Sequence, residues 1–561
     1  MKQKNTLRWI WQVAGTKKGY ILLLTLTQGV SGAFGVAYAL LFRSVVDAAV
    51  GKDGAVFRQS AVLLIVLVLV QLAVSAFIRW MSELSRADLE NVFKLRLVDN
   101  ILRKDYASVS AVHTAEWINR ITGDTSVLAG GAVDLLPGMT ATLVRLFSAL
   151  VMIIALDPWF AYVLIPGGIV LMIVSYALRK LLKSLHKAIR ESDGSLRVYL
   201  QEHIGSLMVI KAFSTERQTI AGAAKAMEAH KQARMRSNRF SNIANAGFGL
   251  AMNGMYLLGV IYCAGGILTE RISYGTLTAV IHLIGQVQGP FSSISGYLPK
   301  FYSMLASAER LMEIERFADD VSPAEHAEMR RYYEQELQVL GLRGACFTYR
   351  PRNEEETPVV LRNFNLEIRK GEYIAFCGHS GCGKSTVLKL LMSMYSLDSG
   401  ECYLDSQPLT ARHRRLFVYV PQGNALLNGT IREVVSFAEP EAAGDDARLR
   451  RALKIACADS FVEDLDTRLG EGGSGLSEGQ AQRIAIARAI FADYPILLLD
   501  ESTSALDELT EKRVLENLRK LTDKTVIIVT HRKAVLSICD RVLQFSEAGV
   551  QEAARQESKL V

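Results

Sequence analysis

Residues 373–386 read Tyr373-Ile374-Ala375-Phe376-Cys377-Gly378-His379-Ser380-Gly381-Cys382-Gly383-Lys384-Ser385-Thr386, an apolar strand-like run followed by a glycine-rich loop. Such a loop can close its backbone N–H groups around phosphate oxygens, because glycine has no side chain in the way. The charge of Lys384 suits the terminal phosphates, and the hydroxyl of Ser385 suits Mg²⁺. The segment from Gly378 to Thr386 is therefore predicted to be a P-loop that binds ATP and Mg²⁺.

Outside this segment, the chain falls into two halves of different composition. At 561 residues it is too long for a single core. Long apolar stretches dominate up to about Phe301, whereas beyond that residue the apolar runs are of strand length and are separated by turn residues. This change predicts a membrane part followed by a cytosolic part.

Charge and cysteine content exclude other classes of protein. The net charge of +7 is modest, and the Lys and Arg residues flank the apolar stretches without forming a basic stripe with interleaved aromatic residues. Nucleic acid is therefore not an expected partner. The seven cysteines lack the paired spacing of a metal site, and six of them lie in the C-terminal half. That distribution is typical of reduced thiols in a cytosolic domain.

Six apolar segments approach the length of a bilayer-spanning helix, which needs about 20 residues. Buried helices of a soluble protein are the alternative. Residues 61–70 are apolar on every face, however, and a helix at a soluble surface would not be. The predicted spans, which would contact membrane lipid, are residues 20–42, 59–78, 135–156, 159–178, 248–268 and 274–294.

Positive charge predicts which side of the membrane each connection occupies. Basic residues precede the first span and crowd segments 79–127 and 179–240, whereas segments 51–58, 157–158 and 269–273 are short and nearly uncharged. The N-terminus, both long segments and the C-terminal half are therefore expected in the cytoplasm. Each long segment is expected to extend two neighbouring membrane helices and to join them by a short helix. Residues 1–19 are polar and basic around two tryptophans, which favours an interfacial elbow helix.

Two further segments of the C-terminal half carry chemistry. The run Ile496-Leu497-Leu498-Leu499-Asp500-Glu501 is typical of a buried strand that ends in two carboxylates. There Asp500 would lie near Mg²⁺ and Glu501 beside the attacking water. Upstream, Leu476-Ser477-Glu478-Gly479-Gln480 leads into a helical stretch. A helix start offers unpaired N–H groups and a positive dipole end to a phosphate.

In their order and spacing these motifs resemble the ATP-binding-cassette exporters that fuse six membrane helices to one nucleotide-binding domain. The resemblance rests on the P-loop, Gln422, the signature-like residues 476–480, the pair Asp500-Glu501, residues 504–507 and His531. In the membrane half, residues 202–213 with Glu216 resemble the second cytoplasmic coupling segment of such exporters. Residues 118–124 resemble the region that follows the first coupling segment.

The resemblance implies an α-helical membrane domain with six transmembrane helices, followed by an α/β P-loop nucleotide-binding domain. The expected parts are the elbow helix at 1–19, a membrane domain with two coupling segments at 20–300, a linker at 301–336 and the nucleotide-binding domain at 337–561.

It also implies roles for individual residues. Tyr349 would stack on adenine, although an ordinary strand aromatic is the alternative. Glu501 would be the general base and His531 would contact the γ-phosphate. The metal-binding residues would be Ser385, Gln422 and Asp500. The other nucleotide-binding residues would be Gly378, His379, Ser380, Gly381, Cys382, Gly383, Lys384, Thr386, Ser477, Gly479, Gln480 and Asp507.

A second nucleotide-binding domain is expected, because in this family Ser477 and Gly479 face a nucleotide held by the P-loop of another domain. The chain contains one P-loop and one signature. A homodimer is the simpler expectation, and a heterodimer with a paralogous half-transporter remains open. Glu478 stands where the family usually has glycine, and we expect its carboxylate to turn to solvent.

The implied function is that of an ATP-driven transporter, an ATPase coupled to transmembrane movement, that exports by alternating access. Import of a siderophore-like cargo and an ATP-gated channel or regulatory membrane ATPase are the alternatives. The cargo is left open among a small molecule, a lipid and a peptide. Arg145, in the middle of a predicted span, would face protein or a water-filled cavity, where it would pair with an anionic cargo or with a neighbouring helix. Snorkelling of its side chain toward the cytoplasmic interface is the other alternative. The location suggested is a bacterial inner membrane.

Overall fold

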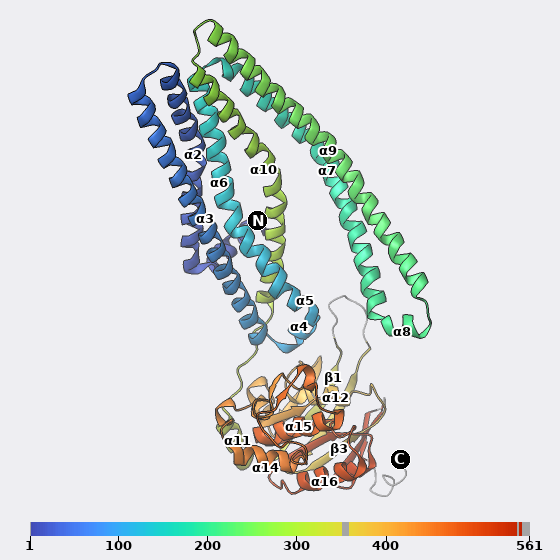
Figure 1. Cartoon of the computed structure of the whole chain (residues 1–561). Helices are drawn as coiled ribbons and strands as arrows, with labels where there is room; N and C mark the ends of the chain where they lie inside the picture. The colour runs from blue at the N-terminus through green and yellow to red at the C-terminus, as the bar shows by residue number, and fades with distance from the viewer. Residues whose placement is uncertain (1, 350–357, 424, 547–548, 553–561) are drawn as a thin grey trace. The chain divides into compact units, whose positions relative to one another are not determined.

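The computed structural model describes residues 2–349, 358–423, 425–546 and 549–552. By packing, the chain divides into two compact units (Figure 1). A helical unit contains Met1–Arg96 and Arg120–Leu311, and an α/β unit contains Leu97–Asn119 and Met312–Val561. The segment Leu97–Asn119 thus packs with the α/β unit, although it lies within the stretch assigned from sequence to the membrane domain.

The helical unit is built from long helices. In chain order its elements are α1 (Lys2–Val13), η1 (Gly15–Lys17), α2 (Lys18–Val50), α3 (Gly54–Arg103), η2 (Arg120–Asp124), α6 (Thr125–Leu156), α7 (Trp159–Gly205), α8 (Leu207–Ala212), α9 (Glu216–Leu268) and α10 (Tyr274–Glu313). The six predicted spans lie on α2, α3, α6, α7, α9 and α10. In the part of the chain that the structure describes, four helices are long and apolar enough to cross a membrane. The count of six spans therefore stays a prediction.

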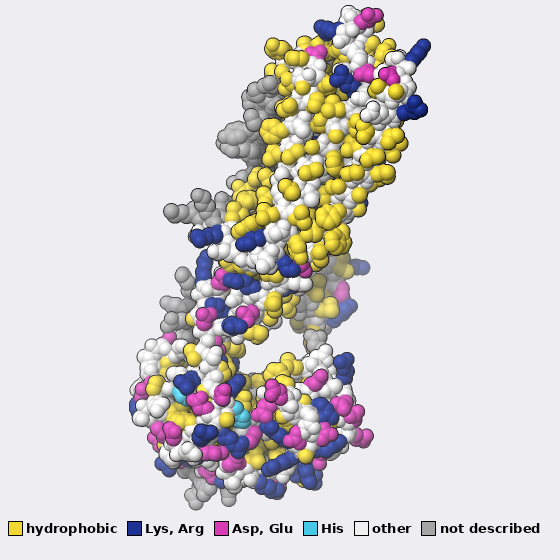
Figure 2. Space-filling model, turned by 90° about the vertical axis from the view of Figure 1, so that its left-hand side faces the viewer, with side chains coloured by type: hydrophobic (Ala, Val, Ile, Leu, Met, Phe, Trp, Pro, Cys, Tyr) yellow, Lys and Arg dark blue, Asp and Glu magenta, His cyan; other side chains and the backbone are white. Residues whose placement is uncertain are grey.

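Apolar side chains cover much of the outer surface of these helices (Figure 2). On α3, Val62, Ile65, Leu69 and Leu72 are exposed at helical spacing. A soluble protein would bury such a stripe or replace it with polar residues. Its exposure over several turns suits contact with lipid.

Close backbone contact holds α2 against α6. A Cβ atom added to Gly32 of α2 would lie 2.7 Å from the carbonyl oxygen of Ala141 on α6. Small residues let membrane helices approach in this way, so that dispersion contacts stabilise the pair. Around this contact Ala39 of α2, Ile153 of α6 and Leu283 of α10 are fully buried in one core.

Helices α7 and α9 form an antiparallel pair joined by α8 (Figure 1), and Phe160 and Cys263 of this pair are buried in the same core as α2, α6 and α10. The hydroxyl of Tyr199 on α7 donates to the carbonyl oxygen of Thr219 on α9 at 3.0 Å. This arrangement of two extended helices and a short connecting helix is the one expected for segment 179–240. The short helix leaves Leu207, Met208 and Val209 exposed.

The α/β unit combines a six-stranded, a four-stranded and a two-stranded sheet with surrounding helices. Its helices are α4 (Tyr106–Ser110), α5 (Thr114–Asn119), η3 (Ile314–Arg316), α11 (His326–Gln335), α12 (Lys384–Leu391), η4 (Ala411–Leu416), α13 (Ile431–Val435), η5 (Pro440–Ala442), α14 (Asp446–Ile455), η6 (Glu471–Gly473), α15 (Glu478–Ala492), α16 (Glu508–Arg519) and α17 (Lys533–Leu536). Its strands are β1 (Val339–Phe347), β2 (Leu361–Arg369), β3 (Tyr373–Cys377), β4 (Ser399–Leu404), β5 (Gln407–Pro408), β6 (Phe417–Val420), β7 (Gly429–Thr430), β8 (Arg468–Leu469), β9 (Ile496–Asp500), β10 (Thr525–Val529), β11 (Arg541–Ser546) and β12 (Gly549–Glu552).

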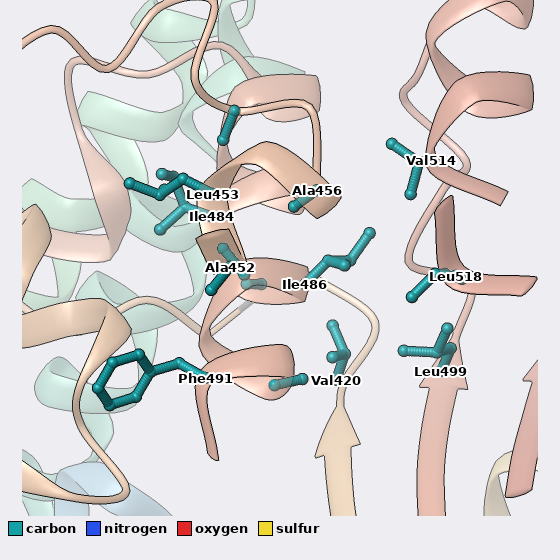
Figure 3. Close-up of a cluster of buried hydrophobic side chains, with 14 of the residues drawn as sticks. Val420, Ala452, Leu453, Ala456, Ile484, Ile486, Phe491, Leu499, Val514 and Leu518 are labelled. Atoms are coloured by element: carbon teal, nitrogen blue, oxygen red, sulfur yellow. The ribbon is translucent and has the colours of Figure 1, made fainter. Parts of the chain in front are cut away.

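The larger sheet has the strand order β12-β11-β3-β10-β9-β6, and every pairing except that of β12 is parallel. The antiparallel sheet has the order β2-β1-β4-β5. Both faces of the parallel sheet are covered, so β9 and β10 are buried along their whole length and consist of apolar residues except for Asp500 and Thr525. On one face α14, α15 and α16 pack against β6 and β9 through Leu453, Ile486, Leu499 and Leu518 (Figure 3).

Candidate active site

The candidate site lies where four parallel strands end. Strands β3, β6, β9 and β10 are neighbours in one sheet, so that their carboxyl ends meet at the same edge. The P-loop follows β3, Gln422 follows β6, Asp500 closes β9 and His531 follows β10. Sequence motifs that are up to about 150 residues apart are thereby assembled at one edge.

The P-loop leads from β3 into α12. Gly378 requires glycine twice over, because its φ is +139° and an added Cβ would lie 2.4 Å from the carbonyl oxygen of Phe545. Lys384 is buried, and its ammonium donates to the carbonyl oxygens of Gly378 at 2.6 Å and His379 at 2.9 Å. The lysine charge is therefore held inside the curve of the loop, where phosphate would bind.

Asp500 and Ser385 are brought together, as expected for two metal-binding residues. The Ser385 hydroxyl donates to Oδ1 of Asp500 at 3.1 Å, and the Tyr419 hydroxyl donates to Oδ2 at 3.0 Å. The Asp500 carboxylate is buried. Burial, and then the negative charge of Asp500, raise the pKa of Tyr419 well above its usual value, so the phenol stays protonated and acts as a donor.

Glu501 lies between Gln422 and His531, which were also predicted to belong to the site. The Gln422 amide donates from Nε2 to Oε2 of Glu501 at 2.8 Å, and Nε2 of His531 lies 3.6 Å from Oε1. The backbone of Glu501 is left-handed, with φ of +49°, and its N–H donates to the carbonyl oxygen of Val529 at 3.0 Å. Such a conformation costs on the order of 1 kcal/mol for a residue with a side chain, and it turns the carboxylate out of the strand direction.

Tyr349 lies beside the P-loop. Its hydroxyl is 3.0 Å from the Thr386 hydroxyl, and its ring meets the rings of Phe347 and Tyr395 edge to face. Tyr395 in turn contacts α4, because its ring meets that of Tyr106 and its hydroxyl is 3.3 Å from the Ser110 hydroxyl. The predicted adenine-binding residue is thus part of an aromatic cluster that also touches the segment between α3 and α6.

The signature residues cap α15. Ser477 accepts from the Gln480 N–H at 3.3 Å, and the Gln480 side chain accepts from the Ser477 N–H at 2.8 Å, which forms a capping box. Glu478 is exposed in the first helical turn, and among the described residues no ion pair holds it. An added Cβ at Gly479 would lie 2.9 Å from the carbonyl oxygen of Ala505. The signature therefore packs against residues 504–507 of its own chain.

Residues 504–507 are fixed from two further sides. The Gln482 side chain on α15 binds the Ser504 hydroxyl at 3.1 Å and accepts from the Ala505 N–H at 3.0 Å. Asp507 caps α16 by accepting from the Thr510 N–H at 2.9 Å. That N–H bond is the largest cause that lowers the pKa of Asp507. The predicted Asp507 is thus presented on a rigid turn at the start of α16.

Arg532 and Glu511 extend this network, and sequence reasoning missed both. The Arg532 guanidinium donates to the carbonyl oxygen of Leu506 at 2.8 Å and to the buried carboxylate of Glu511 at 3.1 Å. Glu511 also accepts from the Thr503 hydroxyl at 2.8 Å. A signal was present, because Glu511 shares a helix face with the buried Val514, Leu515 and Leu518. A carboxylate on an apolar face indicates a buried partner.

The predicted residues thus form two groups in one chain. The first contains the P-loop, Tyr349, Gln422, Asp500, Glu501 and His531. The second contains Ser477, Gly479, Gln480 and Asp507. Within the described residues, the hydrogen bonds and ion pairs of the P-loop join it to the first group, and none joins it to the signature.

The fold and the site define a P-loop nucleotide-binding domain joined to a helical membrane domain. Comparison with known protein families agrees with this two-domain organisation. The sequence profile of the ABC transporter transmembrane region matches residues 21–291, and the ABC transporter profile matches residues 361–504. The chain belongs to the ATP-binding-cassette transporters, so the predicted family, the binding of ATP and the fold class, apart from the count of six membrane helices, are confirmed.

Similar proteins include a leukotoxin translocation ATP-binding protein, LktB, from Pasteurella haemolytica-like sp. (strain 5943B). It is 31% identical over 373 residues, which are 65% of this chain and 51% of that protein. The chain spans about half the length of the LktB relatives it matches. An ABC transporter ATP-binding protein of Bacillus subtilis (strain 168), YfiC, is 26% identical over 96% of this chain and 89% of its own length.

Among solved structures, a bacterial Atm1-family ABC exporter with ATP bound is similar over 97% of this chain and 96% of its own. The TM-score is 0.77 and the sequence identity is 21%. The likeness therefore extends over both units and concerns the fold.

Proposed function

We propose that this chain is one half of an ATP-driven exporter, in which ATP hydrolysis at a dimeric interface drives alternating access of the membrane helices. One observation carries the proposal. The chain holds a P-loop group and a signature group, and no described hydrogen bond or ion pair joins them. A second copy would supply the missing half of each site, so that two ATP molecules lie between two domains.

In this site Glu501 acts as the general base. Gln422 and His531 on either side fix its carboxylate, and His531 then contacts the γ-phosphate. Ser385, Asp500 and Gln422 would hold Mg²⁺, because they offer the hydroxyl, carboxylate and amide oxygens that this ion accepts together with phosphates. When bound, the ion neutralises charge on the phosphates. Tyr349 stacks on adenine.

The proposed partner is a second copy of this chain. The P-loop, Glu501, His531 and the signature serine and glycine are all present, so two copies would form two complete sites. The exposed apolar side chains of α8, Leu207, Met208 and Val209, support a partner as well, because apolar side chains exposed to water at the end of a long helix pair favour a covering surface.

The proposed cargo is a small molecule, a lipid or a peptide, and the proposed location is a bacterial inner membrane, with the α/β unit in the cytoplasm. The names of the LktB relatives speak of translocating a leukotoxin, which is a property of those proteins. The outcome that distinguishes export from import is the direction of transport.

A trapped dimer tests the proposal. The Glu501→Gln variant should hold two ATP molecules per two chains in native mass spectrometry, and Ser477→Arg in the same background should remove the occluded nucleotide. A monomer that holds one ATP at saturation, with no dimer detected, would overturn the dimeric site. In inside-out vesicles, ATP should drive a fluorescent lipid or dye inward. ATP-dependent release of preloaded probe would indicate import, and single-channel currents would indicate a channel.

A further inference from the structure

Arg145 is exposed in the middle of the span predicted on α6, opposite the face that suits lipid. The lipid-facing stripe of α6 consists of Leu136, Met139, Leu143, Phe147 and Val151, which are exposed and apolar at spacings of three or four residues. Arg145 is two residues away from both Leu143 and Phe147, which places it about 200° around the helix. The stripe continues on both sides of Arg145 along the axis, so the guanidinium lies at the depth of the hydrocarbon.

The surroundings of Arg145 identify what it faces. One turn before it, the Thr142 hydroxyl lies 3.1 Å from the hydroxyl of Tyr297 on α10. One turn after it, Ala149 is fully buried in the core shared by α2, α6 and α10. An added Cβ at Gly32 of α2 would lie 3.3 Å from the Arg145 backbone nitrogen. The arginine therefore lies between α2 and α10.

Beyond the level of Arg145, two polar side chains of α10 lie against α2. The side chain of Gln286 rests against Gly35, one turn beyond Gly32. Its Nε2 lies 3.3 Å from Nε2 of His282, whose ring centre is 4.7 Å from that of Tyr38 on α2. We call Arg145, Gln286 and His282 the polar seam. Among the described residues, no carboxylate lies within ion-pair distance of Arg145.

A guanidinium at hydrocarbon depth is costly unless it faces protein groups or water, and this one faces away from lipid and has no paired carboxylate in the part of the chain that the structure describes. We propose that the polar seam is the anion-binding part of the cargo pathway, so that the exported molecule carries a carboxylate, sulfonate or phosphate group. This inference rests on the proposed transport function. Gln286 and His282 add hydrogen-bonding groups for the neutral part of such a molecule.

Charged thiol reagents test the seam without a known cargo. A cysteine at position 286, made by Gln286→Cys, is treated with anionic methanethiosulfonate ethylsulfonate or with the cationic trimethylammonium analogue. Mass spectrometry of the peptide containing this position reads the rates, so the native cysteines do not interfere. The anionic reagent should react faster, and Arg145→Gln should lower the ratio of the two rates about tenfold, because one nearby charge acts oppositely on them.

Arg145→Lys should keep most of that ratio, which separates a charge effect from misfolding. An unreactive cysteine would mean that the seam is dry, and an unchanged ratio in Arg145→Gln would mean that the arginine does not attract anions. Either result would overturn the inference. The measurement needs no ATP and no transport, so its failure is distinguishable from failure of the proposed function.

A second inference concerns Tyr419, which no sequence motif singled out. Its hydroxyl and that of Ser385 bind different oxygens of Asp500, at 3.0 Å and 3.1 Å. Two donors on opposite oxygens stop the buried carboxylate from rotating. Tyr419 itself is fixed, because β6 pairs in register with β9, with Tyr419 opposite Leu498. The structure assigns Tyr419 as a positioning residue that holds Asp500 in the orientation that binds Mg²⁺.

Nucleotide binding with and without the ion tests this assignment, using the full-length protein. In Tyr419→Phe, the gain in ATP affinity that Mg²⁺ provides should fall about tenfold, as expected for one hydrogen bond to a carboxylate. Affinity for ATP in EDTA should not change. Tyr403→Phe, a buried tyrosine on β4 of the other sheet, serves as the matched control and should leave both affinities unchanged. An unchanged Mg²⁺ effect in Tyr419→Phe, or an equal loss in EDTA, would overturn the assignment.

Discussion

The α/β unit and the helical unit position their polar side chains in different ways. In the α/β unit, functional side chains follow the ends of parallel strands, and each has a neighbour that fixes it, such as Ser385 for Asp500 or Gln422 for Glu501. In the helical unit, the polar seam runs along helices whose positions depend on backbone contacts such as that at Gly32. The first arrangement depends on short motifs, and the second depends on how whole helices pack.

The largest effect on activity should come from replacing one carboxylate oxygen in the site of the α/β unit. Glu501→Gln should lower ATP hydrolysis at least about a hundredfold, because a general base typically contributes that much or more. ATP binding should persist. Phosphate release and nucleotide binding are the measurements, with Glu508→Gln, an exposed carboxylate in the first turn of α16, as the control. Hydrolysis by Glu501→Gln at near the parental rate would place the base elsewhere.

A backbone contact should be the sensitive point of the helical unit. Gly32→Ala should destabilise the packing of α2 on α6 by about 1–3 kcal/mol, because the new methyl group would meet the backbone at Ala141. Gly29→Ala is the matched control, since its Cβ would lie 3.5 Å from a Thr140 methyl group, an ordinary contact. Thermal unfolding in detergent reads the difference. Equal midpoints for the two variants would show that close approach at Gly32 is not required.

A smaller effect should arise at Asp493, which ends α15 and lies 2.6 Å from the ammonium of Lys524 and in contact with Arg330. Burial alone would raise the pKa of Asp493, but Lys524 and Arg330 hold it below its usual value. Asp493→Asn should therefore cost on the order of 1 kcal/mol at pH 7, since the carboxylate is partly exposed. Asparagine tolerates the left-handed backbone at this position.

The sign of the pH dependence follows from that shift. A carboxyl group whose folded pKa is depressed stabilises the fold above its unfolded pKa, about 3.9, and the contribution is lost as pH falls through the folded pKa. The free energies of unfolding in urea of the parent and of Asp493→Asn should differ between pH 6 and 8, and the difference should begin to shrink below about pH 4 and disappear below the folded pKa. A difference that persists in acid would point to packing instead of charge.

The smallest effect is expected at Glu478. Its side chain is exposed at the first turn of α15, so Glu478→Gly should change steady-state ATP hydrolysis less than about twofold. A large rise in activity would mean that the carboxylate faces the phosphate of the partner site and repels it. Glu478 is the position at which an otherwise complete signature departs from the family pattern, so either result shows what this departure does to ATP hydrolysis.

The features that could be predicted from the sequence are those carried by short motifs, and the features that could not are those that depend on packing. The P-loop, Asp500-Glu501 and the capping signature were found because their chemistry is carried by consecutive residues, and the structure brings the P-loop and Asp500-Glu501 together at one sheet edge. Tyr419 and Arg532 were missed because their partners, Asp500 and Glu511, become neighbours only through strand register and helix packing. The apolar segments were located from composition, but the packing of Leu97–Asn119 with the α/β unit was not, because periodicity does not report tertiary contacts.

The length of α7 has a mechanical consequence. The helix contains 47 residues and is therefore about 70 Å long, of which the predicted span takes about 30 Å. The remaining 40 Å or so acts as a lever that ends at α8. A change in tilt of about 5° within the bilayer would then move the tip by about 3.5 Å, which exceeds the length of a hydrogen bond. A small change in the tilt of α7 within the membrane is thereby amplified into a displacement of α8 that is large enough to break a specific contact.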